Sequence, residues 1–191
     1  MGGRLSRFVE VLFGESGAVE ADADDLFDVT SGYTTLGSAG YDAAGRAGLC
    51  LSRADGVAFE RILDDVDALL ALSTETPGTD YDVVDDDHGY RWLVVEDRAF
   101  DDLVTTVHTA ADALIAEGYS EYLLCAAFAF EGERTVYWIY NFSRGTWYPF
   151  VPAGATMRDG DREGQLAALV EGEFDLEDDP SRRYPFWSIP V

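Results

Sequence analysis

Apolar residues recur at strand spacing and at helix spacing in turn along the first half of the chain. The run "AGLCLS", residues 47–52, predicts a strand. A helix is expected from Asp55 to about Leu72, because apolar side chains return there every three or four residues. Two strands, "DYDVV" and "YRWLVVE", then flank "DDDHG", whose Asp and Gly residues suit a hairpin turn.

The strongest helical pattern covers residues 98–117, and Gly118 is expected to end that helix. The strand "EYLLCAAFAFEG" follows, and its apolar residues on both sides predict a central position with both faces covered. Residues from about 47 to 131 therefore have the order β-α-β-β-α-β, which is the ferredoxin-like, split βαβ order. The fold class predicted is α+β, with helices packed on an antiparallel sheet.

Two helices are expected before this unit. Residues 4–13 carry apolar side chains on one face and predict an amphipathic helix, which packs on its own domain or, as an alternative, contacts a partner or a membrane surface. Asp22 or Asp24 is expected to cap a second helix that runs to about Leu36. Its buried side should consist of Leu26, Val29, Tyr33 and Leu36. The Gly- and Ala-rich stretch "GSAGYDAAGRAG" is expected to be a loop.

The segment "VYWIYNFSRGTWYPFVP", residues 136–152, predicts an aromatic hairpin that extends the sheet. Alternation puts Trp138, Tyr140 and Phe142 on one face and Tyr137 on the other. A short helix at about 162–171 and a C-terminal covering tail, residues 173–191, follow. With no long linker, residues 1–191 are expected to form a single domain.

Two interpretations of the hairpin remain open. Its aromatic side chains form a core that Tyr184, Phe186, Trp187 and Ile189 of the tail help to cover, or one face stays exposed to bind a partner. On the second interpretation, changing Trp147 and Tyr148 to Ser should weaken capture of the partner without unfolding the domain. The candidate partner-binding residues are Trp138, Tyr140, Phe142, Arg144, Trp147, Tyr148 and Phe150.

The composition is strongly acidic. The net charge is −24, from 37 acidic residues and 13 basic residues that are all Arg. A Lys-free, acidic surface is typical of adaptation to molar salt, where the Debye length falls to about 3 Å and like charges repel weakly. A nucleic-acid mimic is the alternative. Nucleic-acid binding is not expected, because no basic stripe is present to contact phosphates.

Cys50 and Cys125 lie in apolar runs and are expected to be buried free thiols in a reducing cytoplasm. No apolar run reaches the roughly 18 residues that a membrane span needs. A signal peptide is not expected either, because Glu10 interrupts the apolar stretch near the N-terminus. The sequence therefore predicts a cytoplasmic protein.

Residues that could support catalysis are few. Asp85, Asp87 and His88 are weak candidates for metal ligands, although an acidic turn normally faces water. The sequence contains no phosphate-binding loop, dinucleotide fingerprint or nucleophile elbow. We expect no enzymatic activity and no cofactor. The alternatives are a small-molecule sensor with a pocket lined by Trp92, Trp138 and Tyr140, and a metal-dependent enzyme that uses the acidic turn.

Five stretches of the chain carry a family resemblance: "EADADDLF", "GYDAAGRAGLCLS", "DDDHGYRWLVVED", "AFAFEGERTVYWIYNFSRGTWYPFVP" and "LEDDPSRRYPFW". Together they resemble the PspA-associated protein PspAB family of halophilic archaea, over residues 20–187. The most specific parts are "DDHGYRW" and "YWIYNFSRGTWYPF".

The resemblance implies an association rather than a reaction. The expected partner is PspA, a helical, peripheral membrane protein of the phage shock response, together with a companion called PspAA. This chain would be an accessory or regulatory protein in envelope stress, recruited to the inner face of the membrane through its partner. The resemblance implies no catalytic residues.

Overall fold

The computed structural model describes residues 22–52, 61, 65–66, 68, 78–187 and 189–191. The helix predicted over residues 4–13 lies outside these residues, as does most of the helix predicted over residues 55–72. The four described positions of the latter, at 61, 65, 66 and 68, are helical, and Val66 is buried.

The centre of the fold is a six-stranded antiparallel sheet with the order β2-β3-β1-β4-β5-β6. β1 lies between β3 and β4, so the connection from β3 through helix α4 to β4 crosses over β1. This is the split arrangement that the sequence predicts, and the α+β class is confirmed. The strands are β1 (Asp42–Leu51), β2 (Asp80–Asp85), β3 (Arg91–Glu96), β4 (Leu123–Glu131), β5 (Val136–Asn141) and β6 (Thr146–Phe150).

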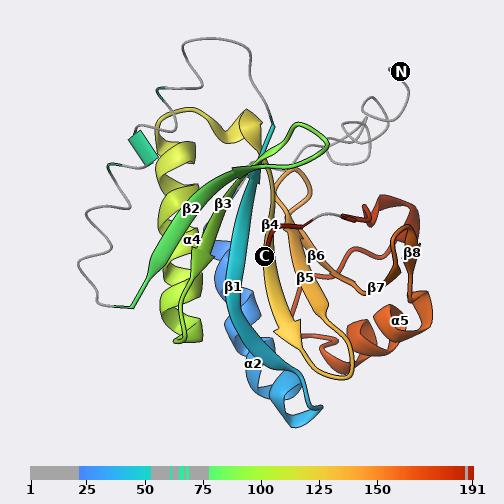
Figure 1. The fold of residues 1–191 in the computed structure, drawn as a ribbon. Helices are drawn as coiled ribbons and strands as arrows, with labels where there is room; N and C mark the ends of the chain where they lie inside the picture. The colour runs from blue at the N-terminus through green and yellow to red at the C-terminus, as the bar shows by residue number, and fades with distance from the viewer. Residues whose placement is uncertain (1–21, 53–60, 62–64, 67, 69–77, 188) are drawn as a thin grey trace.

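The helices α2 and α4 cover one face of the sheet, and the C-terminus lies in front of the other face (Figure 1). α4 ends close to its predicted limit, because Gly118 adopts a positive φ of 84° that suits a glycine after a helix. β7 and β8 form a separate two-stranded ribbon beside α5. The remaining elements are η1 (Asp24–Phe27), α2 (Asp28–Ser38), α4 (Phe100–Ala116), η2 (Ser120–Tyr122), β7 (Pro152–Gly154), β8 (Met157–Arg158), α5 (Gly160–Leu169) and η3 (Pro180–Arg182).

Strand alternation divides the core into two layers. On β1, Leu49 and Leu51 pack toward the helices, whereas Cys50 belongs to the cluster on the opposite face. β4 is buried on both sides at every position except its last, as expected for a central strand.

The buried side of α2 differs from the predicted one at Tyr33, and α5 buries an acidic residue. Tyr33 is 38% exposed, because it lies at the edge of the core. There its ring stacks on Phe100, with a distance of 4.5 Å between the centroids. On α5, Leu169 is exposed, whereas Glu163 faces inward beside Leu166. Among the described helices, none combines the length and the apolar character that a membrane crossing requires.

β1 begins five residues earlier than predicted, inside the stretch that was expected to be a loop. Asp42 and Ala43 pair with the end of β4, and a bulge between Ala43 and Ala47 separates them from the rest of the ladder. Gly45 lies in this bulge with φ 71°, and its carbonyl accepts a hydrogen bond from the Asp97 N–H at 3.0 Å. Pairing with β4 therefore overrides the weak strand propensity of glycine and alanine.

Replacing Gly45 with Ala is expected to lower the free energy of unfolding by about 1–3 kcal/mol. The left-handed backbone disfavours any side chain, and an added Cβ would lie 2.9 Å from the Asp97 carbonyl oxygen. Urea unfolding at molar salt measures the change. Gly37→Ala is the matched control, because an added Cβ there meets nothing within 4 Å and alanine favours the helix. Equal stability of the two variants would contradict the account of the bulge.

Candidate functional site

The aromatic side chains of the hairpin point to both faces of the sheet, and the six predicted to bind a partner are buried. Tyr148 and Phe150 lie on the face opposite the helices, together with half-buried Tyr137. The other four face the helices: Trp138, Tyr140, Phe142 and Trp147. These residues do not form an exposed aromatic surface in this structure, so partner binding through them would require a covering segment to move.

The helix-side aromatics form one packed cluster. The Trp147 ring lies 5.2 Å from Tyr140 and 5.5 Å from Phe174, measured between centroids. The backbone N–H of Trp147 donates to the Asp175 carbonyl at 2.7 Å, and its backbone carbonyl accepts from the Glu177 N–H at 2.8 Å. The segment around residue 176 therefore covers the outer edge of β6, which removes an open edge from the sheet.

Tyr140 links this cluster to the segment that leads into α2. Its hydroxyl donates to Asp25 Oδ2 at 2.8 Å, and the Asp22 carbonyl oxygen lies 3.1 Å from the same hydroxyl. Burial, followed by the hydrogen bond to Asp25, raises the pKa of Tyr140 well above its usual value. The hydroxyl therefore stays protonated and acts as a structural donor.

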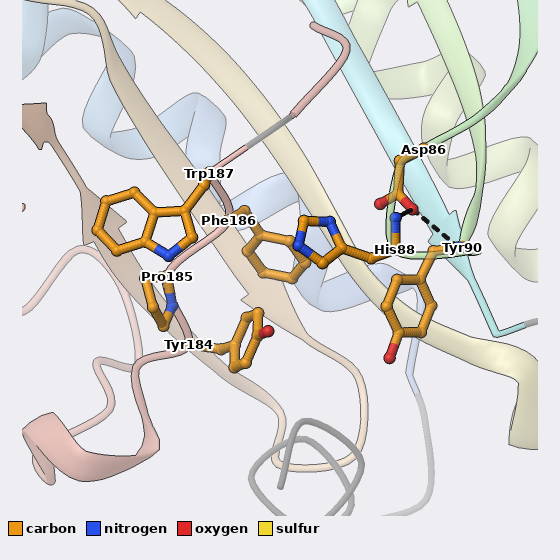
Figure 2. A pocket seen from close by; sticks show the side chains of 7 residues that line it. All are labelled: Asp86, His88, Tyr90, Tyr184, Pro185, Phe186 and Trp187. Carbon is orange, nitrogen blue, oxygen red and sulfur yellow. Dashed lines mark hydrogen bonds between the residues drawn. The ribbon is translucent and has the colours of Figure 1, made fainter. Parts of the chain in front are cut away.

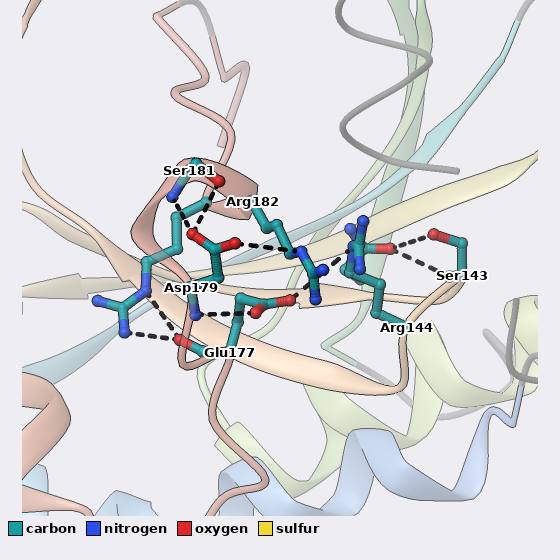
Figure 3. Close-up of polar contacts among 8 residues, drawn as sticks. Ser143, Arg144, Glu177, Asp179, Ser181 and Arg182 are labelled. Atoms are coloured by element: carbon teal, nitrogen blue, oxygen red, sulfur yellow. Dashed lines mark hydrogen bonds and ion pairs between the residues drawn. The ribbon is translucent and has the colours of Figure 1, made fainter. Parts of the chain in front are cut away.

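Arg144, the predicted charged contact, lies at the hairpin turn against the C-terminal loop (Figure 3). Its Nε is 3.9 Å from Glu177 Oε2, and both side chains are largely buried. Glu177 also accepts from the Asp179 N–H at 3.0 Å. Arg183 donates to the Glu177 carbonyl from two nitrogens, at 2.9 and 2.6 Å. Arg144 therefore helps to join the turn to the loop that leads to the C-terminus.

The face of the sheet opposite the helices is packed by residues 184–187 and 189–191, called here the terminal segment. Phe186 lies edge-on to Trp92 at 5.6 Å, and Trp187 lies edge-on to Phe150 at 5.4 Å. The Tyr148 hydroxyl donates to the Tyr184 carbonyl at 3.2 Å. In the described part of the chain, the buried cluster on this face draws its members from the strands, Tyr90 and the terminal segment, and from no helix.

The acidic turn between β2 and β3 meets the terminal segment (Figure 2). The Asp86 carboxylate accepts from the N–H groups of His88 and Tyr90 at 2.8 and 2.9 Å, and from Trp92 Nε1 at 3.1 Å. A depression of about 10 Å³ lies between this turn and residues 184–187, which is room for about one water molecule. Asp86 therefore organises the turn and supports the position of Trp92.

The turn does not assemble a metal site from the candidate ligands. The Asp85 carboxylate pairs with Arg91 Nε at 2.6 Å. Among the residues that the structure describes, no group of three or more His, Cys, Asp or Glu side chains is placed to hold a metal ion.

The pocket predicted between Trp92, Trp138 and Tyr140 is not formed. All three side chains are buried, and Trp92 lies on the opposite face of the sheet from the other two. A groove of about 240 Å³ is found instead over β2, β3 and β1, beside Pro190 of the terminal segment. Its lining residues are Arg46, Asp80, Tyr81, Asp82, Val84, Val94, Glu96 and Pro190.

Comparison with known proteins gives a family match over nearly the whole chain. The model of the family PspAB, described as PspA associated protein B, matches residues 6–191. No curated protein and no solved structure matches the chain.

Proposed function

Because the chain belongs to the PspA associated protein B family, we propose that it is a non-enzymatic accessory protein of a PspA-type membrane-stress system. It acts by binding a PspA-type helical protein, with a PspAA companion as a further component. The family match over residues 6–191 is the observation that carries this proposal. Recruitment to the inner face of the membrane, through the partner, follows from the same proposal.

The face under the terminal segment is the contact surface that we favour. The strands beneath it are hydrogen-bonded to one another, so the sheet keeps its ladder when the terminal segment moves. Phe186 is the one buried residue of the described terminal segment, and its neighbours are half-buried. Departure of the segment would uncover Trp92, Tyr148 and Phe150, an aromatic group of the kind that dominates binding energy at interfaces. The apolar face of a partner helix would take its place.

An apolar contact also suits the charge of the chain. The chain has a net charge of −24, so its surface would repel any acidic partner at low salt. At molar salt such charges are screened within about 3 Å, whereas burial of apolar surface still stabilises a complex. We propose that the chain is adapted to high intracellular salt, on the basis of its acidic, Lys-free composition.

Replacing Phe186 with Ala is expected to strengthen binding of the PspA-type protein of the same organism by about threefold to tenfold. The variant loses the packing of Phe186 on Trp92, so the uncovered state is more populated and the partner has less to displace. Titration calorimetry at molar salt measures the dissociation constant, with folding checked by circular dichroism.

Met157→Ala is the control for that experiment, because Met157 is 63% exposed on β8 and belongs to neither buried cluster. Its affinity should equal that of the unmodified protein. Unchanged or weaker binding by folded Phe186→Ala would place the contact on another surface. Absence of binding by all three proteins would contradict the accessory function itself.

A small-molecule sensor is the second candidate, favoured by the groove of about 240 Å³ beside Pro190. Both charge signs line it, and Arg46 and Glu96 pair across two strands within it. Because ligand sites usually enclose about 300–1,000 Å³, we place this candidate second. A thermal-shift screen of metabolites at molar salt tests it, with Arg46→Ala as the variant that should lose any response.

A further inference from the structure

Cys50 and Cys125 face each other across the centre of the sheet. Cys50 lies on β1 and Cys125 on β4, and the antiparallel register pairs the two residues directly. Both thiols are free and fully buried, as the sequence predicts. The sequence alone does not show that these two residues, 75 positions apart, lie opposite each other on one ladder.

The rung places the thiols within reach of a disulfide. Residues directly opposite in an antiparallel pair have Cα atoms about 4.5–5.5 Å apart, and disulfides join Cα atoms about 4.4–6.8 Å apart. Both side chains project to the same face and belong to one buried cluster. Bond formation would therefore need no change of strand register.

The terminal segment controls access to this pair. Trp92 is the register partner of Cys50 on β3, and Phe186 packs on Trp92. Tyr148 belongs to the same cluster and is tied to the Tyr184 carbonyl. Burial, and then the contact with Cys125, raises the pKa of the Cys50 thiol well above its usual value, so the reactive thiolate is disfavoured while the cover is in place.

We propose that Cys50 and Cys125 are a redox-modification site, which a hydroperoxide converts to a cross-strand disulfide when the terminal segment lifts. One thiolate attacks the peroxide oxygen, the O–O bond breaks, and a sulfenic acid and water form when hydrogen peroxide is the oxidant. The second thiolate attacks the sulfenic sulfur, the S–S bond forms, and a second water leaves. Two electrons pass from the sulfurs to the peroxide, and two thiol protons end in the two waters.

Hydrogen peroxide added to the full chain at molar salt, below the unfolding transition, tests the proposal. Peptide mapping without reduction should find a Cys50–Cys125 linkage within a monomer, and dithiothreitol should restore both thiols. Phe186→Ala should form the linkage about tenfold faster, because the cover opens more often. Cys50→Ser and Cys125→Ser are matched controls, in which the remaining thiol should stop at sulfenic or higher acids.

Three outcomes would overturn the proposal. The first is exclusive formation of sulfinic acids in the unmodified protein, because the second thiol would then fail to intercept the sulfenic acid. The second is linkage only between two chains. The third is equal rates in the unmodified protein and in folded Phe186→Ala, since the terminal segment would then have no control over access.

Discussion

Replacing Trp147 with Ser is expected to lower the free energy of unfolding by about 3–5 kcal/mol. The indole is fully buried, and its centroid lies 5.9 Å from Phe128 in addition to its contacts with Tyr140 and Phe174. The substitution leaves a large cavity among Phe128, Tyr140 and Phe174 that the packed rings cannot fill. Its neighbour Tyr148 is just as buried on the other face, so the double Ser variant should be less stable still.

Trp187→Ser provides the matched control, because Trp187 is a half-buried indole in the terminal segment rather than in the helix-side core. Its expected loss is about 1 kcal/mol, in proportion to the smaller area buried. Urea titrations at constant molar salt compare the two. A Trp147→Ser protein as stable as Trp187→Ser, yet unable to bind the PspA-type partner, would support an exposed hairpin surface and contradict the burial described above.

Replacing Glu163 with Ala is expected to lower the free energy of unfolding by about 3–5 kcal/mol. Glu163 is only 3% exposed, and Arg158 Nε donates to its Oε2 at 2.8 Å. Arg158 Nη2 lies 2.6 Å from the same oxygen and completes the ion pair. The carboxylate also accepts from the Val151 N–H at 2.9 Å. Arg158 Nη1 in turn donates to the Arg183 carbonyl at 2.8 Å. Loss of the carboxylate leaves a partly buried guanidinium and a buried N–H without their acceptor.

A double-mutant cycle with Arg158→Met separates the ion pair from the packing of α5. The double variant should be less destabilised than the sum of the two single variants, because Glu163→Ala then leaves no orphaned charge. Asp161→Ala, which removes an exposed acid two positions earlier on α5, is the control and should lose less than about 1 kcal/mol. Strict additivity within the cycle would show that the two side chains do not act as a pair.

The sheet and α4 could be predicted because apolar residues recur regularly over long stretches of the sequence, and glycines end these stretches. α4 lies within two residues of its predicted limits at each end, and the split strand order follows from the order of elements. The start of β1 could not be predicted in this way. Its first residues are small, and they pair only because Gly45 permits a bulge opposite β4.

The site was less accessible to sequence reasoning. Alternation correctly divided the hairpin between two faces, but it cannot show what covers each face. Coverage depends on the helices on one side and on a C-terminal segment distant in sequence on the other. Glu163 was missed because one buried acid among 37 acidic residues has no distinctive pattern, although Arg158 five positions earlier is its partner. The Cys50–Cys125 pairing was missed because register between distant strands is set by tertiary packing.

We propose that a PspA-type partner binds where the terminal segment lies, and a reversible lock on that segment tests this placement. A Cβ added at Gly48 lies 2.8 Å from Val191 Cγ1, so Gly48→Cys with Val191→Cys should allow a disulfide to hold the segment down. Cys50→Ala and Cys125→Ala remove competing thiols, and the protein with these two changes alone serves as the control. The dissociation constant for the partner is then measured before and after reduction. We predict that the locked protein binds at least about tenfold more weakly and that reduction restores binding, whereas equal affinity in the two states would contradict the claim.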